Sequence, residues 1–128
     1  MSDDDLATLR ELSRHSDRLD QAAENDRRAA LRETITEQLL AIDAGERQKT
    51  VSVWDGELAA LSTALDEHPA HAQAIGNALR EEFDDASKGE PDRSEVLRRA
   101  LRLGLREAAP DYVDDLRAAV RDHATRDL

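Results

Sequence analysis

The chain has 128 residues, of which 29 are acidic and 18 are lysine or arginine, and its formal net charge is −11. A chain of this length fits a single domain that buries a modest core. Because the sequence holds no cysteine, disulfides, thiolate catalysis and cysteine-based zinc sites are excluded.

Helix-forming residues dominate the apolar part of the sequence. Alanine occurs 21 times and leucine 17 times, whereas the aromatic residues are limited to Trp54, Phe83 and Tyr112. Because β-forming residues are so few, we expect a mainly α-helical protein and neither a sandwich nor a doubly wound sheet. No apolar stretch approaches 18 residues and the first residues are acidic, so we expect no membrane span, no secretory signal and a cytoplasmic location.

The acidity has two interpretations. Lysine occurs only at Lys49 and Lys88, and aspartate (17) outnumbers glutamate (12). This composition resembles that of haloarchaeal proteins and indicates adaptation to molar intracellular salt; the alternative is an ordinary acidic, solvated surface. Residues 92–109 depart from the pattern, with five arginines against three acids. If the protein binds a polyanion, we expect the contact near this basic segment.

The N-terminal part of the chain predicts two helices. Residues 3–23 have the pattern of a polar helix with leucines on a ragged face, and Asn25-Asp26 is expected to interrupt it. A second helix is expected over residues 27–43, where apolar residues recur at helical spacing, and Gly45 is its natural C-terminal stop.

Residues 48–54 carry the one strand signal in the sequence. Val51 and Val53 would point to one face of such a strand, and Thr50 and Ser52 to the other. A lone strand cannot satisfy its own N–H and C=O groups. Either this segment pairs with a strand from another chain or it is not a strand.

Three further helices are expected after the strand signal. From Leu58 to Phe83 the apolar residues recur at spacings of three and four, and Pro69 is expected to break this stripe and begin a new helix. Asp92 predicts the start of a helix that runs to Ala108, and Pro110 predicts the start of the last one.

Two pieces of the sequence together resemble the ribbon-helix-helix (MetJ/Arc-type) DNA-binding family. One is Thr50-Val51-Ser52-Val53 leading into a helix, and the other is the run of residues 89–98, Gly-Glu-Pro-Asp-Arg-Ser-Glu-Val-Leu-Arg. The resemblance implies a mainly α, ribbon-helix-helix-like dimer with one short β-strand per chain and additional flanking helices. In that family the two strands form a ribbon that enters the major groove of DNA.

The resemblance also implies roles for individual residues. Side chains that face outward from the ribbon would contact bases, and the start of the second helix would bind a phosphate. The candidate DNA-binding residues are Gln48, Thr50, Ser52, Arg93, Ser94 and Arg98. The candidate dimer core is formed by Val51, Val53, Trp54, Val96, Leu97 and Leu101.

The spacing between the two pieces is longer than in the family. We therefore expect an N-terminal helical segment over residues 1–47, a ribbon-helix-helix-like unit over 48–109 with a helical insertion around 69–88, and a C-terminal helix over 110–128. In an alternative register, residues 69–83 are themselves the second helix of the family pattern.

Two functions from different classes are compatible with these features. The sequence shows no catalytic constellation, no glycine-rich phosphate loop and no metal-ligand set, so we expect no enzyme, cofactor or metal site. The leading expectation is a sequence-specific, repressor-like DNA-binding regulator that acts as a homodimer with its ribbon in the major groove. The alternative is a helical protein–protein adaptor or antitoxin-like protein in which the ribbon mainly dimerises. Both functions are compatible with a protein partner that binds the N- or C-terminal helices.

Overall fold

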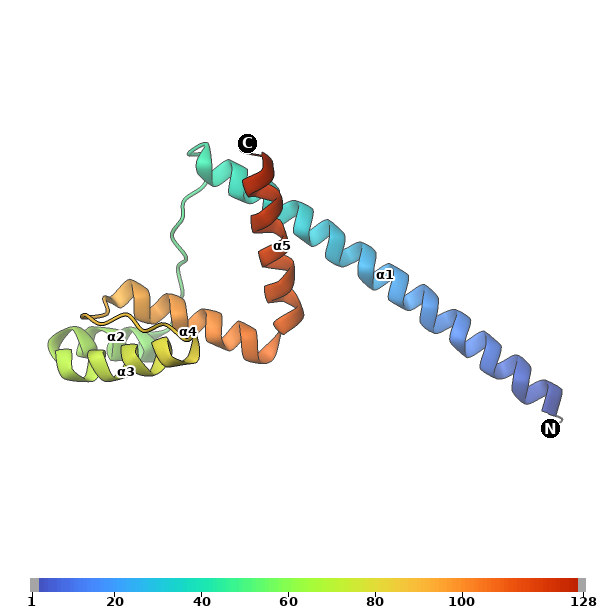
Figure 1. Ribbon diagram of the computed structural model, residues 1–128, viewed down its shortest axis with the longest axis horizontal. Helices are drawn as coiled ribbons and strands as arrows, with labels where there is room; N and C mark the ends of the chain where they lie inside the picture. The colour runs from blue at the N-terminus through green and yellow to red at the C-terminus, as the bar shows by residue number, and fades with distance from the viewer. Residues whose placement is uncertain (1–2, 127–128) are drawn as a thin grey trace. The chain divides into compact units, whose positions relative to one another are not determined.

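The computed structural model describes residues 3–126, which form five helices (Figure 1). In chain order these are α1 (Asp3–Asp43), α2 (Gly56–Glu67), α3 (Pro69–Glu82), α4 (Arg93–Ala108) and α5 (Pro110–Arg126). The protein is mainly helical, as its content of alanine and leucine indicates. Within the described range, no helix has the length and apolar character needed to cross a membrane.

The β-strand expected at residues 48–54 is absent, and the ribbon-helix-helix-like fold that depends on it is wrong. No strand occurs between residues 3 and 126, and residues 51–55 are a non-helical connection that leads into α2. A strand needs a neighbour for its backbone N–H and C=O groups, and the regular elements of the described chain are all helices. Val51 and Val53 accordingly remain 74% and 63% exposed.

The expected break between two N-terminal helices is also wrong, because α1 continues through Asn25 and Asp26. Asn and Asp each weaken a helix interior by only about 0.7 kcal/mol relative to alanine. Both have the backbone N–H that proline lacks. Side-chain contacts support this part of the helix. Gln21 donates to Asn25 Oδ1 over 3.4 Å, and Arg27 pairs with Glu24 at 2.6 Å.

Four expected helix boundaries are confirmed. Pro69 and Pro110 are the first residues of α3 and α5. Asp92 caps α4, where its Oδ1 accepts a hydrogen bond from the backbone N–H of Glu95 at 2.7 Å. Gly45 follows the end of α1 with φ of +79°, a conformation that glycine adopts without strain.

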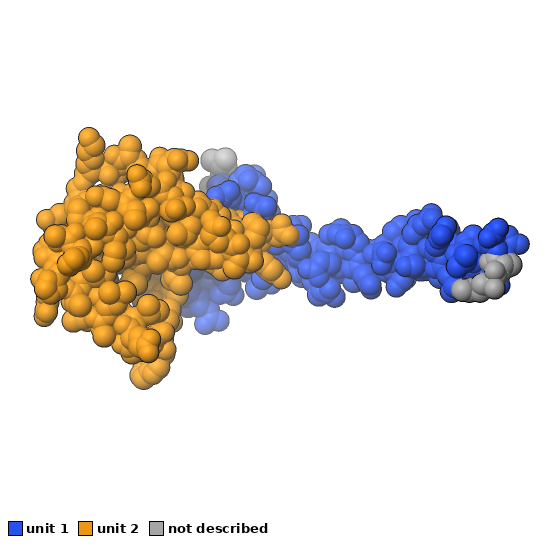
Figure 2. Space-filling view, turned by 90° about the horizontal axis from the view of Figure 1, so that it is seen from below, with its two compact units in different colours: residues 1–48, 114–128 blue, residues 49–113 orange. Residues whose placement is uncertain are grey.

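The chain divides into two compact units (Figure 2). Unit 1 comprises residues 1–48 and 114–128, which include α1 and most of α5. Unit 2 comprises residues 49–113, which include α2, α3 and α4.

In unit 1, a buried carboxylate holds α5 across the C-terminal half of α1 (Figure 1). Asp115 is 2% exposed and accepts hydrogen bonds from Arg28 at 2.9 and 3.2 Å and from Arg32 at 2.9 Å. Donation by Arg28, reinforced by Arg32, holds the pKa of Asp115 below its usual range although burial opposes this shift. The charge therefore stays on the carboxylate, and α5 stays joined to α1.

The same crossing continues about two helical turns further along α5 and about three further along α1. Thr36 of α1 and Ala119 of α5 are buried, and His123 Nε2 lies 2.6 Å from Asp43 Oδ2. Because the paired residues advance together in number, α5 runs in the same direction as this half of α1.

The first half of α1 is exposed on all sides. Every residue from 3 to 23 is exposed, including Leu6, Leu9, Leu12 and Leu19. We call residues 3–23 the arm; as a helix it spans about 31 Å at 1.5 Å per residue.

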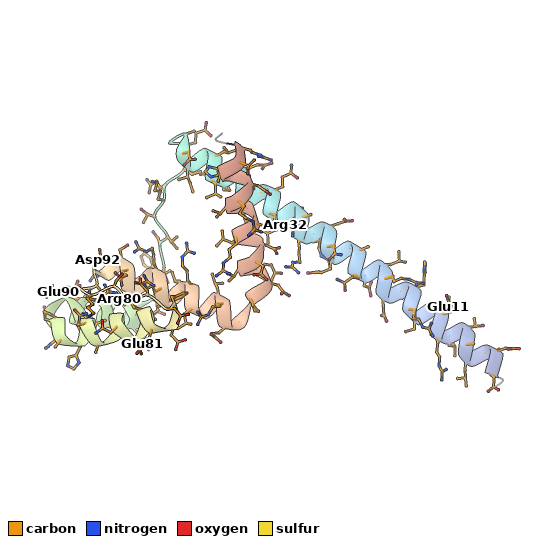
Figure 3. The ribbon with its side chains drawn as sticks, viewed as in Figure 1. Glu11, Arg32, Arg80, Glu81, Glu90 and Asp92 are labelled. Atoms are coloured by element: carbon orange, nitrogen blue, oxygen red, sulfur yellow. The ribbon has the colours of Figure 1, made fainter. Side chains whose placement is uncertain are left out.

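In unit 2, α3 packs against both α2 and α4. Arg80 of α3 is 5% exposed and joins three parts of the unit (Figure 3). Its guanidinium donates to both carboxylate oxygens of Glu95 on α4, at 2.6 and 3.0 Å, and to the carbonyl oxygens of Ser87 and Gly89 at 3.2 and 2.9 Å. These bonds fix the connection between α3 and α4.

The same connection is docked on α3 at a glycine. Pro91 is buried, and a Cβ added at Gly76 would lie 2.2 Å from Pro91 Cγ. The chain before α4 therefore approaches α3 more closely than any side chain at position 76 allows.

Candidate functional site

The residues expected to contact DNA are divided between the two units. Gln48 belongs to unit 1, whereas the others belong to unit 2. Thr50 and Ser52 are exposed in the non-helical segment before α2. Arg93, Ser94 and Arg98 lie in the first turns of α4.

The start of α4, expected to bind a phosphate, is occupied by groups of the protein itself. The Asp92 carboxylate accepts the N–H of Glu95, and Arg93 pairs with Asp66 of α2 at 2.6 Å. Ser94 Oγ accepts a long hydrogen bond of 3.5 Å from Arg98. A carboxylate at the helix start repels the phosphate that the free N–H groups would otherwise attract.

Other arginines of the basic segment are neutralised within unit 2. Arg99 pairs with Asp85, and Arg106 pairs with Glu82 at 3.2 Å. Both guanidinium groups also lie over the ring of Phe83, at 5.6 and 4.9 Å from its centre. Unit 2 as a whole has 8 lysines and arginines against 13 acids, and this charge balance opposes the approach of a polyanion.

Arg98 and Arg102 are the cations of α4 that have no acidic partner within the described part of the chain. They stand four residues apart, so they share one side of the helix. On that side they flank Leu101 and Leu105, which are both about half exposed.

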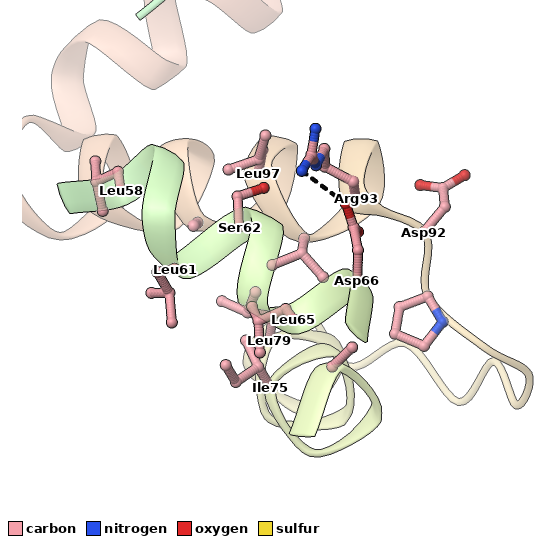
Figure 4. A pocket seen from close by; sticks show the side chains of 14 residues that line it. Leu58, Leu61, Ser62, Leu65, Asp66, Ile75, Leu79, Asp92, Arg93 and Leu97 are labelled. Carbon is pink, nitrogen blue, oxygen red and sulfur yellow. Dashed lines mark ion pairs between the residues drawn. The ribbon is translucent and has the colours of Figure 1, made fainter. Parts of the chain in front are cut away.

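Most of the residues expected to form a dimer core line a hollow on unit 2. Val51 and Val53 share a cavity of about 560 Å³ with Leu97 and Leu101 of α4. An adjoining cavity of about 220 Å³ lies between α2, α3 and α4, with Val96 in its wall (Figure 4).

The two hollows share part of their lining. Leu58, Ser62, Arg93, Leu97 and Ala100 line both. We call the combined feature the groove and define it by the following apolar residues: Val51, Val53, Leu58, Leu61, Leu97 and Leu101.

The chain by itself leaves the groove open to solvent. Leu97 and Leu101 are 44% and 49% exposed, Leu58 and Leu61 are about half exposed, and Trp54 beside Val53 is fully exposed. Fully burying an aliphatic side chain of this size contributes about 1.5–3 kcal/mol. A partner that covers the groove therefore gains a substantial driving force.

Local contacts hold the walls of the groove in place. Asp55 caps α2 by accepting the N–H of Leu58 at 3.1 Å. The pair between Arg93 and Asp66 joins α4 to α2 at the rim (Figure 4). Because both side chains of this pair are about half exposed, it contributes at most about 1 kcal/mol and serves mainly to position the walls.

Leu58 and Leu61 were not expected to be functional residues. Their spacing of three places them in the same apolar stripe as Leu65, and that stripe was interpreted only as evidence for helices. The available signal was the number of leucines, because three short helices cannot bury all of their leucine side chains against one another.

The described residues hold no group of three or more His, Asp or Glu side chains arranged to bind a metal ion. No curated protein and no solved structure matches the chain. A match over residues 1–128 shows that the chain belongs to the family described as a domain of unknown function (DUF8115).

Proposed function

We propose that this protein is a helical protein–protein adaptor whose groove binds the apolar face of an amphipathic helix. The observation that carries the proposal is the apolar groove along residues 51–53, α2 and α4, whose leucines the chain leaves about half exposed. Binding of a helix in such a groove is a recurrent mode of recognition, and the bound helix presents apolar side chains at positions i, i+3 or i+4, and i+7.

The size and chemistry of the groove support this mode. Its cavities of about 220 and 560 Å³ fall within or near the range of about 300–1,000 Å³ that binding pockets occupy. Leucine and valine line its centre, whereas Arg93 and Asp66 lie at its rim. An apolar centre with a polar rim is the usual anatomy of a protein–protein interface.

The exposed area of the chain also supports a partner. The chain exposes 10247 Å², whereas two separate compact bodies of half its mass would together expose about 8,000 Å². Because the two units are treated as separate bodies, this excess of about 2,000 Å² does not depend on how they are placed. The leucines of the groove and of the arm are among the large apolar side chains that remain exposed.

DNA binding has less support in the geometry. Arg98 and Arg102 are the cations that α4 leaves for phosphates. Two phosphate contacts give a slope of log K against log salt of only about −1.8, compared with −5 or steeper for proteins that make six to ten contacts. Such a contact is too weak to hold an acidic protein on DNA.

Photo-crosslinking tests the proposed function directly. The photoreactive residue p-benzoylphenylalanine is placed at Leu101 in the groove or, as the control, at exposed Glu81 on α3. The full chain is irradiated in the cells that express it, and adducts are identified by mass spectrometry. We expect peptide adducts at position 101 whose apolar residues are spaced by three, four or seven and so share one face of a helix. Nucleic-acid adducts, or no adduct at position 101 above the level at position 81, would overturn the proposal.

A further inference from the structure

We infer that the helix bound in the groove is the arm of a second copy of this chain. The inference rests on the proposed function and adds the identity of the partner. It joins two features that the single chain leaves unexplained: an apolar groove without cover, and a leucine-bearing helix without a neighbour.

The arm has an exposed apolar face, although Ser16 stands seven residues after Leu9 and the next leucine of the face is Leu19. Leu9, Leu12 and Leu19 are spaced by three and seven residues and are 53%, 61% and 57% exposed. Spacings of three and seven place side chains on one face of a helix. In proteins most helical stability comes from packing of such a face rather than from propensity, and the arm finds no such packing in its own unit.

The charges of the arm and of α4 are complementary. The arm carries six acids and three arginines, whereas Arg98 and Arg102 on α4 have no acidic partner among the described residues. Acids on the arm can therefore pair with Arg98 and Arg102, while Asp55, Asp66 and Asp92 also line the groove. Two arms packed together would instead bring like charges into contact, and this arrangement is unfavourable.

The lengths of the two apolar stripes also agree. Leu9 to Leu19 spans about 15 Å along the arm, and Leu97 to Leu105 spans about 12 Å along α4, at 1.5 Å per residue. The stripe of one arm is thus about 3 Å longer than that of α4, which is long enough to cover the open leucines of one α4.

Reciprocal exchange of arms produces a closed dimer. Two identical arm-to-groove contacts related by a two-fold axis leave no free arm or groove, so the assembly stops at two copies. The surplus exposed area of about 2,000 Å² per chain exceeds the total of about 1,200–2,000 Å² that a stable interface buries.

Complementation between two defective variants tests the inference. The arm variant carries Leu9→Gln and Leu12→Gln, the groove variant carries Leu97→Gln and Leu101→Gln, and the control carries Val120→Gln at an exposed position of α5. Glutamine has nearly the helix propensity of leucine, so the helices are retained. Masses are measured by light scattering at micromolar concentration and molar potassium chloride, and helix content by circular dichroism.

We expect the natural chain and the Val120→Gln control to have twice the monomer mass of 14.2 kDa. The arm variant and the groove variant should each be monomeric alone. Their equimolar mixture should form a dimer, because an intact arm then meets an intact groove. If the groove variant loses helix content, Arg98→Glu with Arg102→Glu replaces it and should weaken association at least tenfold.

Each contrary result would overturn the inference in a different way. A monomeric natural chain excludes a second copy, a dimeric arm variant indicates contact between two grooves, and a dimeric groove variant indicates contact between two arms. A mixture that stays monomeric excludes the exchange. Crosslinks from Leu101 to a different protein would end this inference and leave the adaptor function standing.

Discussion

The guanidinium of Arg80 and the carboxylate of Glu95 form a two-bond ion pair that joins α3 to α4, with N–O distances of 2.6 and 3.0 Å. The same guanidinium binds the carbonyl oxygens of Ser87 and Gly89. The pair with Arg80 holds the pKa of Glu95 below its usual range although partial burial opposes this shift. Because α4 is a wall of the groove, this one side chain sets the position of that wall.

Replacing Arg80 should destabilise unit 2. Arg80→Met leaves Glu95 and two backbone carbonyls without their donor, and loss of one partner of a buried pair is strongly destabilising. We expect the thermal unfolding midpoint to fall by several degrees. The matched control is Lys88→Met at an exposed position of the same unit, where a substitution changes stability by about 0.5 kcal/mol or less. Equal midpoints for the two variants would show that the ion pair is not structural.

Two glycine-to-alanine substitutions should have opposite effects. Alanine normally stabilises a helix interior by about 0.8–1 kcal/mol relative to glycine. At Gly104 of α4 the added Cβ meets no atom within 4 Å, so the free energy of unfolding of unit 2 should rise by about that amount. At Gly76 the Cβ would lie 2.2 Å from Pro91, and such overpacking costs about 1–3 kcal/mol. Urea unfolding measures both, and a gain in stability for Gly76→Ala would contradict the close approach.

Acid should destabilise the protein through two carboxylates. Hydrogen bonds from Arg80 lower the pKa of Glu95, and those from Arg28 and Arg32 lower the pKa of Asp115. A carboxyl group whose pKa is lower in the folded state stabilises the protein at pH values above its pKa in the unfolded state, which is about 4. That stability is lost as the pH falls from about 5 through the pKa of the folded state.

The pH effect is measured as the urea midpoint at pH 7, 5 and 3 in molar salt, which screens general repulsion between surface acids. The natural chain should lose stability over this range. A double variant with Glu95→Gln and Asp115→Asn should be less stable at pH 7 and should lose less on acidification. A midpoint that stays level or rises at low pH in the natural chain would refute the assignment.

Salt should stabilise the protein at neutral pH. A net charge of −11 creates repulsion that opposes the compact state. Raising potassium chloride from 0.1 to 1 M shortens the Debye length from about 10 to about 3 Å, so the free energy of unfolding should increase. The control is the same comparison near pH 4.7, the isoelectric point of the sequence. A salt effect of the same size at both pH values would show that repulsion is not its cause.

Local signals predicted the helix boundaries well because each depends on one residue's own chemistry. Pro69, Asp92 and Pro110 begin or cap helices where the sequence places them. The break at Asn25-Asp26 was wrong because propensity is a small effect that neighbouring side chains override.

The strand and the site required information about neighbours that the sequence does not carry. Val51 and Val53 have strand-forming chemistry, but a strand exists only with a hydrogen-bonded partner, and the described chain supplies none. The basic segment was recognised from its composition. That Arg93 and Arg106 are paired with Asp66 and Glu82 follows only from the packing of the helices.

Protection of the groove from solvent shows whether the arm of a second copy occupies it. Because the chain has no cysteine, Leu101→Cys and Glu81→Cys each introduce a single reactive site, one in the groove and one exposed on α3. The rate of maleimide labelling is measured at increasing protein concentration in molar potassium chloride, with and without Leu9→Gln and Leu12→Gln in the arm. We expect position 101 to become protected as concentration rises, only with an intact arm, while position 81 reacts at a constant rate. Labelling at position 101 that is independent of concentration, or protection that persists without the arm leucines, would contradict it.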